Sequence, residues 1–255
     1  MLTAATYGLI GGAALLLGAF VGLYTNIPQR AVGAIMAFGS GVLISALTFD
    51  LMAKAYESGG FDSTSIGFVT GAVLYVGGDY LIDRFDGRIH KKSHQKKQSA
   101  KAVSAKPAAP IISGSAIFLG AMLDGIPESA AIGVGLAAGQ GFGLIMLVAV
   151  FISNLPEGIS GAIGMKQAGK SHVYVMSVWS SVVITAGISA LLGYRFLASS
   201  TPDIMAAGLA IAAGAILAML ADTMMPEAFE EGGRLIALVT VMGFLLAFVV
   251  SRLAG

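Results

Sequence analysis

The chain consists largely of runs of about 20 predominantly apolar residues, and this pattern permits few folds. A helix of about 20 residues spans the ~30 Å hydrocarbon core of a bilayer. Backbone polar groups in lipid must be satisfied within the structure, so such runs form helices. Eight runs are predicted, at residues 4–24, 31–52, 65–82, 111–136, 142–165, 174–194, 204–225 and 235–250. The sequence therefore predicts an all-α polytopic membrane protein with eight transmembrane helices in one transmembrane domain, residues 1–255.

The composition excludes several other classes of protein. The chain is 56% hydrophobic and 11% charged, with no cysteine and a net charge of +1. Soluble domains carry about twice that share of charged residues. The near-neutral charge gives no indication of nucleic-acid binding, and the absence of cysteine excludes disulfides, thiolate metal sites and cysteine nucleophiles. The lipid bilayer is the expected surrounding.

Basic residues indicate the orientation, because cytoplasmic loops are enriched in Lys and Arg. With eight spans, one side receives Arg30, Arg84, Arg88, Lys91, Lys92, Lys96, Lys97, Lys101, Lys106, Lys166, Lys170 and Arg234. The other side receives only Lys54, Arg195 and Arg252. This asymmetry predicts that both termini lie outside.

A polar segment at residues 83–110 separates the third and fourth spans and is rich in Lys, Ser, Gln and Ala. This composition predicts a flexible basic cytoplasmic loop. His90 and His94 within it could hold a metal ion loosely, but two His among many Lys are more typical of a plain flexible loop.

Two short stretches place acidic residues inside apolar spans. In the fourth span Asp124 precedes Pro127 and Glu128, and in the fifth span Ser153 and Asn154 precede Pro156 and Glu157. Residues four apart share a helix face, so each helix presents a polar pair on one side. A carboxylate in hydrocarbon is costly and indicates an ion or substrate pathway by default.

These two spans are joined by only residues 137–141, so they must form an antiparallel hairpin. Each contains a proline, which kinks a helix and frees carbonyl groups. The sequence thus predicts a central Pro-kinked pair with inverted symmetry, which is typical of a transporter's binding site. The alternative is that each proline is only a kink, with a protonated Glu bonded to a freed carbonyl.

The candidate metal ligands are Asp124, Glu128, Ser153, Asn154 and Glu157, which all present oxygen. Their carboxylates repel one another in low dielectric unless a divalent cation or protons compensate. Such a set favours manganese, iron(II) or another hard ion more than a His-containing site would, since imidazole suits zinc. No permanently bound cofactor is expected; the divalent ion is the cargo.

Other acidic residues are ambiguous. Asp50, near the end of the second span, and Asp222, in the seventh, are candidates for an ion pathway or for side chains in interfacial water. Asp79 and Asp83 fit a solvated helix end better than a pathway mouth. Glu227, Glu230 and Glu231 follow the seventh span and are predicted to lie in a solvated loop.

At these residues the chain resembles the ZIP (Zrt/Irt-like) family of divalent metal transporters. The resemblance lies in residues 38–44 of the second span, the Asn-x-Pro-Glu-Gly motif at residues 154–158, and residues 212–228 of the seventh span. It implies eight helices in a ZIP-like bundle, outside termini, and a metal site between spans four and five. It further implies elevator-like movement of one helix group past another, and homodimers are known in the family.

The chain departs from the family pattern at several site positions. Asp124 replaces the usual His, Gly125 replaces Asn, and Ser153 stands where His or Gln is frequent. The sixth span has no acidic residue, although many relatives place a Glu there. These departures favour a single site on Asp124, Glu128, Asn154 and Glu157 over a two-metal centre.

The expected function is therefore transport of divalent metal cations such as zinc, manganese or iron(II) into the cytoplasm. We expect an integral protein of a bacterial or archaeal inner (plasma) membrane. The alternatives are a transporter of monovalent cations or protons, and a non-transporting metal-binding relative. A membrane enzyme ranks last, because the spans contain no phosphate cradle and Ser180–Ser181 has no partner base.

Overall fold

The computed structural model describes residues 1–86 and 114–254, and every regular element in that part of the chain is helical. The first half contains α1 (Leu2–Tyr24), α2 (Gln29–Ala46), the π-helical segment η1 (Leu47–Met52), α3 (Ala53–Asp86) and α5 (Gly114–Ala138). The second half contains α6 (Gln140–Gln167), α7 (His172–Leu197), α8 (Pro202–Met219), the π-helical segment η3 (Leu220–Met224), α9 (Met225–Gly232), the short η4 (Gly233–Leu235) and α10 (Ile236–Ala254).

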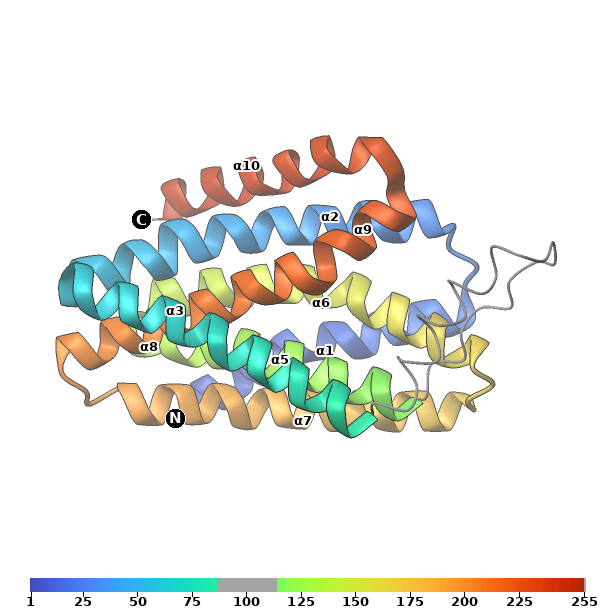
Figure 1. The fold of residues 1–255 in the computed structure, drawn as a ribbon, viewed down its shortest axis with the longest axis horizontal. Coiled ribbons are helices and arrows are strands. Elements are labelled where there is room, and N and C mark those ends of the chain that lie inside the picture. The colour runs from blue at the N-terminus through green and yellow to red at the C-terminus, as the bar shows by residue number, and fades with distance from the viewer. Residues whose placement is uncertain (87–113, 255) are drawn as a thin grey trace.

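Five stretches in the described part are long and apolar enough to cross a membrane. Two of them, residues 29–81 and 202–253, contain 53 and 52 residues, far more than one crossing needs. Each holds a glycine with left-handed backbone torsions, Gly60 (φ 67°) and Gly233 (φ 72°). Figure 1 shows the chain reversing its direction at these two places. After the second reversal, α10 turns back from α9 and lies along α2.

Two predicted boundaries need correction. The helix that begins at Gln29 continues past residue 52 to the reversal at Gly60, and Lys54 and Glu57 lie on its surface as an ion pair (3.6 Å) instead of starting a loop. The predicted polar loop at residues 83–110 also begins too early, because α3 extends to Asp86. Residues 87–110, with His90 and His94, lie outside the described residues.

The helices pack as two groups. In the first helix group α1 packs on α6 and α7, and α5 packs on the same two helices. In the second helix group α3 packs on α8, while α2 packs on α9 and α10. The groups meet where α2 contacts α6 and where α5 contacts α3 and α8. Both termini lie at the same end of the bundle (Figure 1).

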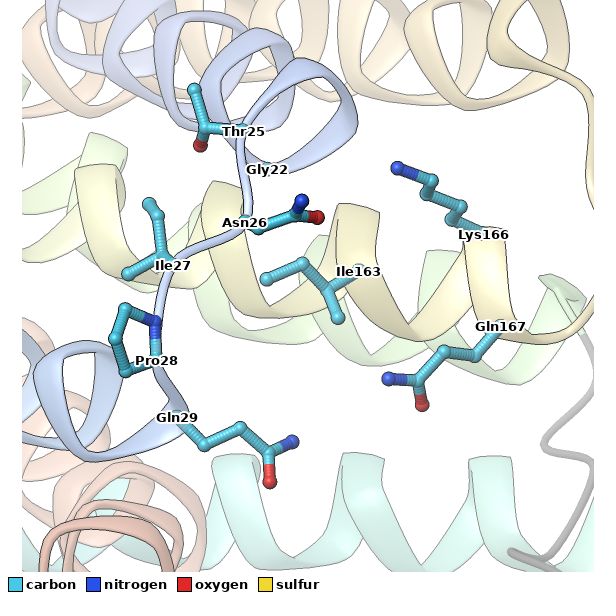
Figure 2. A pocket seen from close by; sticks show the side chains of 9 residues that line it. All are labelled: Gly22, Thr25, Asn26, Ile27, Pro28, Gln29, Ile163, Lys166 and Gln167. Carbon is cyan, nitrogen blue, oxygen red and sulfur yellow. The ribbon is translucent and has the colours of Figure 1, made fainter.

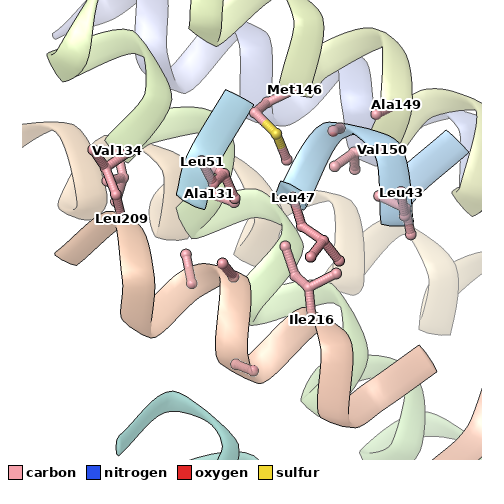
Figure 3. Close-up of a cluster of buried hydrophobic side chains, with 14 of the residues drawn as sticks. Leu43, Leu47, Leu51, Ala131, Val134, Met146, Ala149, Val150, Leu209 and Ile216 are labelled. Atoms are coloured by element: carbon pink, nitrogen blue, oxygen red, sulfur yellow. The ribbon is translucent and has the colours of Figure 1, made fainter. Parts of the chain in front are cut away.

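The main hydrophobic core lies where the two groups meet. Leu43, Leu47 and Ile216 of the second group pack in one buried cluster with Ala131 and Met146 of the first (Figure 3). Apolar burial offers no driving force against lipid, so such contacts act through close packing. The core therefore joins the groups without directional bonds.

Inside the first helix group, α1 approaches the backbone of α6 very closely. A Cβ on Gly18 would lie against the Leu155 carbonyl oxygen and 2.9 Å from the Ile159 nitrogen. A Cβ on Gly158 would lie against the Leu15 carbonyl oxygen. Small residues at these positions let the two backbones touch, as is common in membrane helices.

Candidate metal site

The two Pro-Glu segments come together between α5 and α6. Pro127 lies inside α5 and Pro156 inside α6, and only Gly139 separates the two helices. Ser153 Oγ donates to Glu128 Oε1 (3.2 Å) and shares its proton with the Val150 carbonyl (3.0 Å). Glu128 and Ser153 are completely buried. The hairpin thus brings the polar face of one helix against that of the other.

Three buried oxygens of the predicted ligands accept no hydrogen bond: Glu128 Oε2, Asn154 Oδ1 and Glu157 Oε1. The Asn154 amide nitrogen donates one of its two N–H groups to the Gly11 carbonyl (3.1 Å) on α1. This bond orients the amide, and its oxygen is left without a partner. Buried acceptors without donors are costly, and here they belong to three of the five predicted ligands.

Asp124 lies one turn before Glu128 and is held from the other helix group. The Tyr75 hydroxyl on α3 donates to Asp124 Oδ1 (2.7 Å). Tyr75 is 2% exposed. Sequence reasoning missed this residue, because a tyrosine in an apolar span is indistinguishable from ordinary packing.

The carboxylates of Asp124, Glu128 and Glu157 interact electrostatically with one another. Asp124 also interacts with Asp79, Asp222 and Glu227. As they stand, however, no three His, Asp or Glu side chains in the described part of the chain are gathered closely enough to hold a metal ion. The arrangement is a set of neighbouring acids, looser than a formed coordination shell.

The two candidate pathway residues both lie in π-helical segments. Asp50, in η1, is buried, and its Oδ1 accepts a hydrogen bond from Ser251 of α10 (2.8 Å) while its Oδ2 has no partner. Its carboxylate is therefore packed against α10 and not in interfacial water. Asp222, in η3, is exposed. Single π-turns within helices are frequent at functional sites.

The segment after the seventh span is helical and not the predicted loop. Glu227, Glu230 and Glu231 lie on α9, which continues directly from η3. Glu227 and Glu230 are exposed, as that prediction expected, and Pro226 lies where the π-helical η3 passes into α9.

A separate surface pocket of about 750 Å³ lies at the connection between α1 and α2. It is lined by Gly22, Thr25, Asn26, Ile27, Pro28, Gln29, Ile163, Lys166 and Gln167 (Figure 2). None of the predicted ligands lines it, and Lys166 Nζ already donates to the Leu23 carbonyl (2.8 Å). The lysine therefore caps a carbonyl group at the C-terminal end of α1.

No protein-family model matches the chain. A protein of Arabidopsis thaliana named zinc transporter ZTP29 is 27% identical over 249 residues, covering 92% of this chain and 87% of that protein. The zinc transporter ZupT of Salmonella heidelberg is 29% identical over 230 residues, covering 87% of this chain and 85% of that protein. The chain is thus a homologue of curated zinc transporters over most of its length, and this homology supports the resemblance to the ZIP family.

Proposed function

We propose that this chain transports divalent metal cations across a membrane into the cytoplasm through an oxygen-rich site between α5 and α6. The ligands are Asp124, Glu128, Ser153, Asn154 and Glu157. The observation that carries the proposal is the set of unpartnered, buried oxygens on Glu128, Asn154 and Glu157. A cation bound among them would compensate these oxygens once the side chains draw closer than they stand here, and oxygen ligands suit divalent ions.

The relatives support the class of cargo. Both are named zinc transporters, and this chain aligns with most of the length of each. Their names favour transport over catalysis, and zinc is the first ion to test. Because the ligand set lacks imidazole, we expect manganese and iron(II) to compete better here than at a site that contains His.

Eight crossings account for the helix lengths. A straight helix of 53 residues would be about 80 Å long, well beyond a ~30 Å hydrocarbon core. Division of the two long stretches at Gly60 and Gly233 gives two crossings each, and α5 adds another. With eight crossings both termini lie outside, in agreement with the bias of basic residues.

Binding should be coupled to protonation and movement. Metal ions displace protons from carboxylates, so ion binding at this acidic cluster releases protons. The polar contacts between α5 and α6 lie within the first helix group, and that group can carry them as a unit past the second. Asp222 and Glu227 extend the acidic surface from Asp124 toward the inner end and define the route of release.

Uptake into proteoliposomes tests the proposal. Purified protein should accumulate Zn²⁺ with time, and Glu157→Gln should reduce the initial rate to background, since it removes the charge and keeps the shape. Glu230→Gln on exposed α9 is the matched control and should retain uptake. Unchanged zinc uptake by Glu157→Gln would exclude this site, and accumulation of Rb⁺ or protons alone would exclude the divalent cargo.

A further inference from the structure

We propose that Tyr75 is a positioning residue that holds Asp124 across the boundary between the two helix groups, and that an arriving cation competes with the Tyr75 hydroxyl for Asp124. This inference rests on the proposed function and adds a residue to it. Tyr75 belongs to α3 in the second group, whereas Asp124 belongs to α5 in the first. The Tyr75 hydroxyl donates directly to Asp124 Oδ1 (2.7 Å).

The surroundings of this hydrogen bond are mainly apolar. An apolar groove of about 440 Å³ lies between α3, α5, α7 and α8, and Tyr75, Leu123, Ile126 and Pro127 help to line it. The same region is packed, because Tyr75 on α3, Val134 on α5 and Ala212 on α8 also belong to the main hydrophobic core. The hydrogen bond to Asp124 adds a directional polar link to this apolar contact between the groups.

The hydroxyl and an arriving cation compete for the same carboxylate. Asp124 Oδ1 accepts from Tyr75, and a cation that binds this oxygen would repel the hydroxyl proton that points at it. The packing of α3 on α8 keeps Tyr75 on the second group when Asp124 leaves. Ion binding therefore exchanges a bond between groups for a bond within the first group, which frees the first group to move.

Zinc affinity is the first measurement. Tyr75→Phe removes the hydroxyl and keeps the ring, so the ion no longer competes for Asp124. In equilibrium dialysis of the purified protein against zinc chloride, the variant should bind Zn²⁺ roughly tenfold more tightly, because a hydrogen bond to a carboxylate no longer has to break. A purely structural role would weaken binding instead.

Thiol labelling in the absence of metal is the second measurement. Because the chain contains no cysteine, only the introduced thiol reacts. A Cβ at Gly78 would lie 3.0 Å from the Leu123 side chain of α5, whereas a Cβ at Gly77 has nothing within 4 Å. Labelling of Gly78→Cys should be faster in the Tyr75→Phe background than with Tyr75 present. Labelling of Gly77→Cys should be the same in both.

The outcomes separate the two proposals. Unchanged or weaker zinc binding by Tyr75→Phe, with wild-type uptake intact, overturns the role of Tyr75 alone. Absence of zinc binding and uptake in the wild type overturns the proposed function and this inference with it. If Tyr75→Phe does not fold, Tyr75→Leu, which also lacks the hydroxyl, replaces it and should likewise tighten zinc binding; Tyr194→Phe on α7 should leave binding unchanged.

Discussion

At the scale of single residues, the site depends on which atoms are left without partners. Asn154 donates one N–H group to the Gly11 carbonyl and Glu128 Oε1 accepts from Ser153, which leaves one oxygen of each side chain without a partner. Unpartnered acceptors inside lipid find few free donors on neighbouring helices. If the proposed site is right, this pattern favours positive charge first, and only then a particular metal.

Asp124→His tests the selectivity. Imidazole prefers zinc over manganese, so the variant should raise the zinc preference in a competition uptake assay by about tenfold. Asp124→Asn is the control, because it removes the charge without supplying imidazole. An unaltered ratio of zinc to manganese in Asp124→His would mean that this position does not contact the ion.

At the scale of elements, α1 and α6 behave as one piece because their backbones touch at Gly18 and Gly158. Side chains cannot adjust such a contact, since the opposing atoms are carbonyl and amide groups. The connection is therefore steric and intolerant of added volume.

Gly18→Ala should lower the stability of the folded protein by about 1–3 kcal/mol, the usual cost of overpacking. The midpoint of thermal unfolding in detergent measures this loss. Gly77→Ala, at a glycine of α3 with nothing within 4 Å, should leave the midpoint unchanged or raise it. Equal midpoints for the two variants would contradict the close approach of α1 and α6.

At the scale of the whole molecule, both termini lie at one end, and the α1–α2 connection lies at the other (Figure 1). The eight crossings proposed above would place Asn26 in the cytoplasm and Ser199 outside. Both are exposed residues in short links, so they suit labelling.

Single-cysteine labelling in intact cells checks this topology. Ser199→Cys should react with an impermeant thiol reagent from outside, and Asn26→Cys should react only after permeabilisation. Reaction of Asn26→Cys in intact cells would refute the predicted orientation and, with it, the cytoplasmic direction of transport.

Sequence reasoning located the helices and the Pro-Glu pair because both leave local signals. Apolar length marks a span, and the short link after α5 forces Glu128 toward Ser153. The extension of the second span to Gly59 was missed because Lys54 and Glu57 resemble loop residues until their ion pair on one helix face is seen. Tyr75 was missed because its partner, Asp124, is 49 positions away, and no spacing rule relates two helices that are not joined by a short link.

The close backbone packing of α1 on α6 at Gly18 and Gly158 has a practical consequence. A spin label near the start of α1 would sit far from the ligands in sequence, yet it would travel rigidly with Glu157. If the first helix group moves past the second, the distance from that label to one on α10 would report the displacement of the site. Every ligand atom would remain chemically intact.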